Sequence, residues 1–133
     1  MADSCIFCQI ARGEIPAQMV VNNKEIVAFK DLNPQAPVHI LIIPKKHIGS
    51  LDDASDFYLL GQMVAMAAAI ARQEKIAKTG YRTVINTGKD GGQSVDHLHL
   101  HLLGGRAMSW PPGEGRASEN SLFGSAWGVR FGN

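Results

Sequence analysis

Apolar residues recur at helical spacing in two segments of the chain. The first segment carries four of them, Ile6, Phe7, Ile10 and Ala11, and Gly13 follows as a C-terminal stop. The second segment begins at Ser55, which can cap a helix N-terminus, and runs to Lys78 before Gly80 closes it. Its apolar positions keep a period of 3.6 residues: Leu59, Leu60, Met63, Ala67, Ile70, Ala71 and Ile76. The pattern therefore predicts one short helix and one long helix.

Short runs rich in Val, Ile, Leu and Phe predict the strands. Met19 to Val21 and Glu25 to Asp31 flank Asn22 and Asn23, residues that tolerate a tight turn, so these two runs are typical of a hairpin. Three further strands are expected: Val38 to Ile43 between Pro37 and Pro44, Tyr81 to Thr87, and Ser94 to Leu103 before Gly104. The expected fold class is α+β, with an antiparallel sheet of about five strands and the helices on one side of it.

Composition indicates a single globular domain and excludes several classes of protein. The chain has 133 residues, of which 45% are hydrophobic, and 13 Lys and Arg against 12 Asp and Glu give a net charge of +1. This charge is too small for a protein that binds a nucleic-acid duplex. The longest apolar stretch, Val64 to Ala71, is far shorter than the roughly 18 residues needed to cross a membrane, and the N-terminus lacks the layout of a signal peptide. We expect a cytoplasmic protein with reduced cysteines and no membrane partner.

Three histidines alternate with leucines in the last predicted strand: His97, His99 and His101. Successive side chains of a strand point to opposite faces, so the leucines would enter the core and the imidazoles would share the other face. The first and third imidazoles would lie about 13 Å apart, which disfavours one shared metal ion. A neutral imidazole is, however, a nucleophile and a proton carrier near pH 7.

A glycine-rich turn, Gly88 to Gly92, precedes the histidines, and Ser94 follows it. Backbone N–H groups in such turns can form a concave anion site, although a hairpin turn explains the glycines equally well. Taken with the row of imidazoles and the hydroxyl of Ser94, the turn indicates phosphoester or phosphoramidate chemistry.

These motifs resemble those of the histidine triad (HIT) family. Besides His97 to Leu103, the resemblance rests on several segments between Cys5 and Gly113: Phe29–Asp31, Pro34–His39, Ile43–His47, Asn86 and Gly91–Val95. The ending Leu103–Arg106, followed by Trp110–Gly113, is similar to that of the histidine triad nucleotide-binding branch, the purine nucleoside phosphoramidases. The resemblance implies a HIT domain over residues 1–113 and a C-terminal extension over residues 114–133.

The resemblance also implies a role for each residue of the site. His99 would attack phosphorus and carry a nucleotidyl intermediate, His101 and Ser94 would contact the phosphate and help the leaving amine, and His39 would support them. Asp31 would hold the ribose hydroxyls. The other substrate-binding candidates are Ile6, Phe7, Phe29 and Leu32 around the purine, together with Asn86, Gly92, Gln93, Ser94, Val95, His99, His101 and Trp110. The apolar members of this set could equally be core residues.

The implied reaction is hydrolysis of the P–N bond of purine nucleoside 5'-phosphoramidates, of the AMP-amine or AMP-lysine type, with no cofactor for turnover. His101 stands where family members with glutamine tend to be nucleotidyl transferases, which favours a hydrolase. Asp96 stands where relatives often place an aromatic residue, a departure that could alter the substrate range. The alternatives are a dinucleoside polyphosphate hydrolase of the same family, a purine-nucleotide-binding regulatory module with incidental catalysis, and a zinc-stabilised interaction domain.

Cys5 and Cys8 form a C-x-x-C motif, which by itself fits a redox pair, half of a zinc site or chance. His47 and His97 would complete a Cys2His2 set, the composition that tetrahedral zinc accepts. Family members with the same cysteine pair look like zinc binders that use these four positions. Such an ion, one per chain, would be structural because the protein fills all four positions. The alternative for His47 is a surface histidine.

The resemblance further implies a homodimer joined through the long helix and the strand Tyr81 to Thr87. The Ala67 to Ala71 segment would let the two backbones approach closely, and Trp110 would reach toward the partner's active site. We expect the extension to dock on the same domain or on the partner and to narrow the range of amines, because its apolar residues are unsuited to water: Leu122, Phe123, Trp127, Val129 and Phe131. The alternative is a disordered tail.

Overall fold

The computed structural model describes residues 4–112. The expected docking of residues 114–133, and with it the apolar side chains of the extension, lies outside the described residues. Within residues 4–112 no helix is long and apolar enough to cross a membrane.

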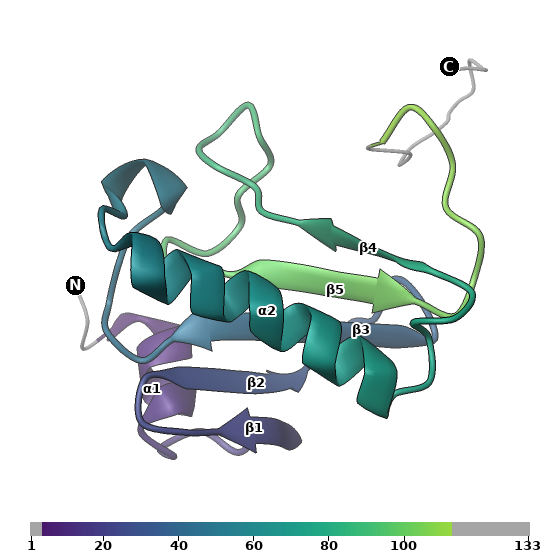
Figure 1. Cartoon of the computed structure of the whole chain (residues 1–133). Coiled ribbons are helices and arrows are strands. Elements are labelled where there is room, and N and C mark those ends of the chain that lie inside the picture. Colours follow the sequence, from purple (N-terminus) through teal and green to yellow (C-terminus); the bar gives the residue numbers. More distant parts are fainter. Residues whose placement is uncertain (1–3, 113–133) are drawn as a thin grey trace.

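A five-stranded antiparallel sheet forms the centre of the molecule, with the strand order β1-β2-β3-β5-β4 (Figure 1). The strands are β1 (Met19–Asn22), β2 (Ile26–Lys30), β3 (Val38–Pro44), β4 (Tyr81–Val84) and β5 (Leu100–Gly104). The helices are α1 (Ile6–Ala11), the short 3-10 helix η2 (Leu51–Asp53) and α2 (Phe57–Gln73). The predicted α+β class, strand number and pair of helices are confirmed, whereas η2 was not expected.

The two α-helices cover opposite faces of the sheet, so the prediction that both lie on one side is wrong. Ile26 and Ala28 of β2 join the core beneath α2, while Val27 and Phe29 join a second core cluster with Phe7 of α1. All four of these β2 residues are buried. A strand with four consecutive buried apolar residues needs cover on both faces, and each helix covers one of them.

Helix α2 is shorter than its apolar period suggested. Its N-cap is Asp56, whose Oδ1 accepts a hydrogen bond from the backbone N–H of Leu59 at 3.1 Å, so Ser55 is not the cap. The helix ends at Gln73, because Lys75 has a φ of +63° that turns the backbone out of the helix. Ile76 lies outside the helix but is buried in the same core. In the sequence it therefore continues the 3.6-residue apolar period past the end of the helix.

The strand that carries the histidines is also shorter than predicted, beginning at Leu100 instead of Ser94. Before that point the chain leaves the ladder, and the backbone N–H of Leu98 donates to the carbonyl of Ile48 at 2.7 Å. β4 likewise ends at Val84, short of Thr87. The separation of faces is confirmed, since Leu98, Leu100 and Leu102 all lie in the core beneath α2. The imidazoles are thereby directed toward the face that α1 covers.

Candidate active site

A cavity of about 250 Å³ lies on the face of the sheet that α1 covers. The structure brings nine of the predicted substrate-binding residues to its wall: Ile6, Phe7, Phe29, Asp31, Leu32, Ser94, Val95, His99 and His101. Sequence reasoning missed six further residues of the wall: Ile10, Lys30 and Leu41, and, from the loop before β1, Ile15, Pro16 and Ala17. Ile15 and Ala17 pack against the core cluster of α1, and their apolar character was the available signal. The cavity therefore combines an apolar body with a few polar groups, as ligand sites usually do.

The remaining predicted residues lie away from this wall. His39 stands behind His101, whereas Asn86, Gly92, Gln93 and Trp110 do not line the cavity. The side chain of Trp110 is exposed over 79% of its surface.

His99 is held in the tautomer that a nucleophile requires. Its Nδ1 lies 2.7 Å from the backbone carbonyl oxygen of His97, and since a carbonyl can only accept, Nδ1 carries the proton and donates. The neutral ring then keeps its lone pair on Nε2. The imidazole is buried, with the ring of Phe7 edge-on at 5.1 Å and that of His101 at 5.0 Å between centroids. The surroundings of His99 thus set both the position of its ring and its tautomer.

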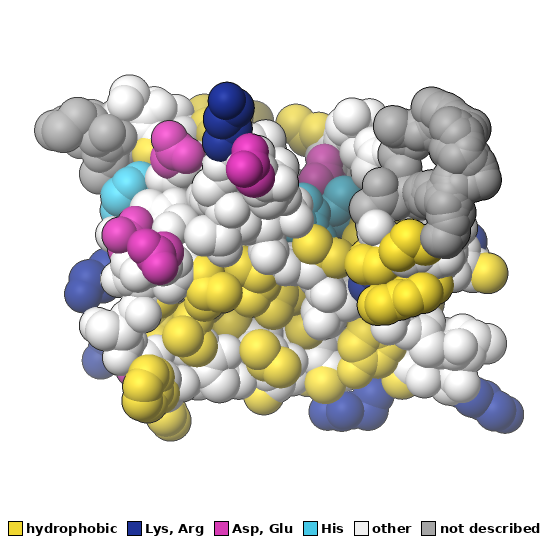
Figure 2. All heavy atoms as spheres, turned by 90° about the horizontal axis from the view of Figure 1, so that it is seen from above, with side chains coloured by type: hydrophobic (Ala, Val, Ile, Leu, Met, Phe, Trp, Pro, Cys, Tyr) yellow, Lys and Arg dark blue, Asp and Glu magenta, His cyan; other side chains and the backbone are white. Residues whose placement is uncertain are grey.

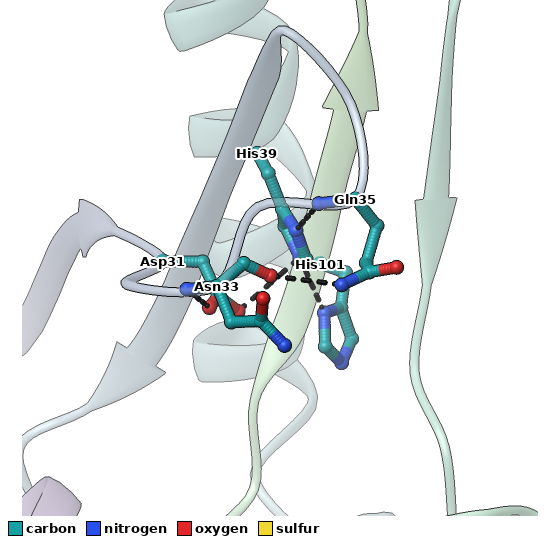
Figure 3. A network of polar contacts seen from close by, with 5 residues as sticks. All are labelled: Asp31, Asn33, Gln35, His39 and His101. Atoms are coloured by element: carbon teal, nitrogen blue, oxygen red, sulfur yellow. Dashed lines mark hydrogen bonds and ion pairs between the residues drawn. The ribbon is translucent and has the colours of Figure 1, made fainter.

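A chain of hydrogen bonds orients His101 (Figure 3). The backbone N–H of Gln35 donates to Nδ1 of His39 at 3.0 Å, so a neutral His39 carries its proton on Nε2. That Nε2 lies 2.9 Å from Nδ1 of His101, which must accept. His101 therefore bears its own proton on Nε2, the nitrogen that points away from His39 in Figure 3. The network presents a hydrogen-bond donor at the polar end of the cavity.

Burial keeps both histidines of this network neutral. Burial, helped by the neighbouring His99 and His39, lowers the pKa of His101 to about 4. Burial also lowers the pKa of His39, opposed by the carboxylate of Asp31. The contact of 3.4 Å between His39 Nε2 and Asp31 Oδ2 is therefore one between a neutral ring and a carboxylate. Oδ1 of Asp31 accepts a hydrogen bond from the backbone N–H of Asn33 at 2.8 Å.

The side chain of Gln93 fastens the glycine-rich loop to the rest of the protein. Its Oε1 accepts from the N–H of Gly88 at 2.9 Å, and its Nε2 donates to the carbonyls of Gly49 at 2.8 Å and Val95 at 2.9 Å. These bonds use both amide hydrogens, and the backbone N–H of Gln93 donates to the carbonyl of Gly88 at 3.0 Å, so Gln93 keeps no donor for the predicted contact with a phosphate. The loop that presents Ser94 is thus anchored by a side chain.

Four residues next to the cavity can hold a metal ion. The donor atoms of Cys5, Cys8, His47 and His97 all lie within 4.8 Å of one another. Nδ1 of His97 lies 3.3 Å from the sulfur of Cys5 and 3.5 Å from that of Cys8, and Nδ1 of His47 lies 3.2 Å from the sulfur of Cys8. These distances are close to the separation of about 3.6 Å that tetrahedral zinc bond lengths imply. Nε2 of His97 donates to the carbonyl of Pro44 at 2.8 Å, which turns the lone pair on Nδ1 toward both thiols. The donor set and its outer hydrogen bond therefore fit a tetrahedral ion.

Asp31, His39 and His101 form a second group whose donor atoms lie within 4.8 Å of one another. Here the tautomer opposes a metal, because the N–H of Gln35 occupies Nδ1 of His39 and leaves the proton on the nitrogen that faces the group. We interpret this group as a hydrogen-bond network.

Comparison with known proteins gives consistent matches over most of the chain. The family model described as HIT domain matches residues 12–108. An uncharacterized HIT-like protein of Synechococcus elongatus is 53% identical over 115 residues, which cover 85% of this chain and 100% of that protein. The purine nucleoside phosphoramidase of Escherichia coli is 49% identical over 110 residues, which cover 81% of this chain and 92% of the relative.

Solved structures of similar proteins share the fold. A HIT family hydrolase from Legionella pneumophila superposes with a TM-score of 0.81 at 53% identity, covering 83% of this chain and all of that one. A Zn-bound histidine triad family protein from Mycobacterium smegmatis gives a TM-score of 0.70 at 29% identity, covering 89% of this chain and 83% of that one.

Replacing His101 by glutamine should make folding less sensitive to acid. Because the folded-state pKa of about 4 lies below the ordinary value of 6.5, the unfolded chain binds a proton between these pH values while the folded chain does not. The stability linked to the neutral ring is therefore complete above about pH 6.5 and declines as the pH falls toward 4. Glutamine cannot titrate, so His101→Gln should lose less melting temperature between pH 7 and pH 5 than the wild type. Both proteins are measured with a chelator, and parallel losses would contradict this.

Proposed function

This chain belongs to the HIT domain family, and we propose that it is a hydrolase that cleaves the P–N bond of purine nucleoside 5'-phosphoramidates. The observation that carries the proposal is the free Nε2 of His99, fixed by the carbonyl of His97 at the polar end of an apolar cavity. The 49% identity with the phosphoramidase of Escherichia coli supports the same reaction class.

The nucleoside occupies the cavity with its base among apolar side chains. Phe7 and Phe29 meet edge to face at 5.7 Å between centroids and form the inner wall, while Leu32, 88% exposed, stands at the mouth. Asp31 lies on the same wall, and its carboxylate suits the two hydroxyl donors of a ribose. This arrangement directs the phosphate toward the histidines.

In the first step the lone pair on Nε2 of His99 attacks phosphorus. The Nε2–P bond forms while the P–N bond to the amine breaks, and the leaving nitrogen takes a proton from the hydroxyl of Ser94, which regains one from solvent. Ser94 is exposed, so water can reach it. The N–H on Nε2 of His101 donates to a phosphate oxygen and stabilises the charge that develops there.

In the second step a water molecule takes the place of the amine. Its oxygen bonds to phosphorus, the P–Nε2 bond breaks, and the proton that the water loses leaves through Ser94 to solvent. The nucleotide is released and His99 regains its lone pair.

His99→Ala should abolish the nucleotidyl intermediate and lower kcat/KM for an AMP phosphoramidate by at least about a thousandfold, because His101, the other imidazole on the wall, presents a protonated Nε2 and no lone pair. Ser94→Ala should be milder, since solvent can protonate the leaving amine. The measurement is rapid acid quench with detection of nucleotide on the histidine. The same assay on a dinucleoside polyphosphate distinguishes the rival substrate. Near-normal single-turnover chemistry in His99→Ala would exclude the mechanism.

We also propose that the four-residue cluster binds one structural zinc ion. Cys5 and Cys8 flank the start of α1, His47 follows β3 and His97 precedes β5, so the ion would tie the short helix to the sheet. All four positions are filled by protein, which supports a structural role. The Zn-bound relative from Mycobacterium smegmatis supports the choice of metal.

Protein purified without chelator should contain about one zinc ion per chain by elemental analysis. Removing the ion, or replacing a ligand in Cys5→Ser, should lower the melting temperature, because binding energy at a structural site is folding energy. At a temperature at which Cys5→Ser stays folded, its kcat with saturating substrate should remain close to that of the wild type. A metal-free preparation whose melting is unchanged by added zinc would refute the site.

A homodimer is the third part of the proposal. β4 is an edge strand, and α2, which packs over β3 and β5, exposes Phe57, Tyr58 and Val64. Figure 2, which looks onto the molecule from above Figure 1 and therefore toward the β4 edge of the sheet, shows hydrophobic side chains gathered across the middle of this view. The expected contact through Ala67 to Ala71 is restricted to two residues, because Ala67, Ile70 and Ala71 are buried in the chain's own core. Ala68 and Ala69 remain, and of these Ala69 is exposed.

Light scattering at micromolar concentration should therefore give twice the mass of the chain. Val64→Asp, which places a charge on the exposed apolar face, should shift the mass toward one chain, whereas Asp52→Asn on η2 should leave it unchanged. A wild-type protein of single-chain mass would exclude the dimer.

A further inference from the structure

A second cavity, of about 400 Å³, adjoins the one that would hold the nucleoside. Ile6, Ser94 and Val95 line both cavities, so the two hollows share a wall. His47 and Asp96 line only the second cavity, whereas His99 and His101 line only the first. A molecule bound at the histidines can therefore extend past Ser94 into the second hollow.

The geometry of phosphoryl transfer assigns this second space to the leaving group. The attacking atom and the departing atom lie roughly in line on opposite sides of phosphorus. With His99 on the nucleoside side, a nitrogen that receives its proton from Ser94 departs next to the shared wall, and its substituent enters the second cavity. The combined space lies within the range of small-molecule sites.

Among the described residues, the wall of the second cavity carries one carboxylate and no lysine or arginine. That carboxylate belongs to Asp96, an exposed side chain for which residues 4–112 provide no ion-pair partner. An unpaired carboxylate at the edge of a cavity attracts a cation, with the modest strength of an exposed pair. Within the described part of the chain, the other titratable groups on this wall are His47 and Cys5, which belong to the four-residue cluster with Cys8 and His97.

We propose that the second cavity binds the leaving amine and that Asp96 gives the enzyme a preference for amines that carry an additional positive charge. The inference rests on the proposed P–N hydrolase function and names the substrate class within it: phosphoramidates of diamines or of basic amino acids. Asp96 acts on specificity, and its carboxylate takes no part in bond breaking.

The test compares two phosphoramidates of AMP that differ only at the far end of the amine. One is made with 1,4-diaminobutane, which keeps a free ammonium group, and the other with 1-aminopentane, which ends in a methyl group of similar size. The ratio of kcat/KM for the two substrates is measured for the wild type, for Asp96→Asn and for the control Asp52→Asn. Comparing this ratio between proteins cancels the intrinsic reactivity of the two P–N bonds.

We expect the ratio to fall by about three- to fivefold in Asp96→Asn, with turnover of the aminopentane substrate unchanged. Added salt should shrink the wild-type ratio toward that of the variant, because exposed charges are screened. Asp52→Asn, which removes a carboxylate from η2 outside both cavities, should keep the wild-type ratio.

An unchanged ratio in Asp96→Asn, or an equal fall in Asp52→Asn, would overturn the assignment of Asp96. In both cases turnover of the aminopentane substrate by the wild type would show that P–N hydrolysis itself stands. Failure of the wild type to cleave either substrate would instead refute the proposed function, and this inference with it.

Discussion

The pairing of β3 with β5 is the interaction on which the site depends. In this antiparallel ladder His39 lies opposite Leu103 and Leu41 opposite His101, so two histidines that are 62 residues apart in sequence meet on one face. A slip by one residue would turn His101 into the core beneath α2 and a leucine into the cavity. The apolar packing of the opposite face therefore determines where the reactive groups lie.

Backbone atoms complete what this pairing begins. The carbonyls of His97 and Pro44 and the N–H of Gln35 each select one tautomer of the imidazole they contact, for His99, His97 and His39 respectively. His97 connects the cavity with the Cys/His cluster, because its carbonyl orients the ring of His99 while its own ring faces the thiols. The path of the main chain therefore determines which ring nitrogen carries the proton. Substitution of neighbouring side chains would leave these tautomers unchanged.

The sequence predicted those features that burial alone decides. The alternation of histidine and leucine from His97 to Leu103 indicated which side chains face the core. The C-x-x-C spacing indicated that Cys5 and Cys8 lie close together at one short helix. The end of α2 could not be read, because Ile76 is buried outside the helix and continues its period. The tautomers were inaccessible as well, since their partners are backbone groups that every residue carries. The anchoring role of Gln93 needed three-dimensional neighbours such as Gly49.

Helix α1 has six residues, too few to persist without tertiary contacts. It nevertheless supplies Phe7 to the cavity and Cys8 to the cluster with Cys5, His47 and His97. The larger core beneath α2 does not include it. Transient detachment of this helix would thus dismantle both functional regions while the principal core stayed folded. Loss of activity would then report the detachment of α1, whereas loss of the core beneath α2 would report global unfolding. Exchange of the α1 amide protons with solvent would follow the detachment of α1.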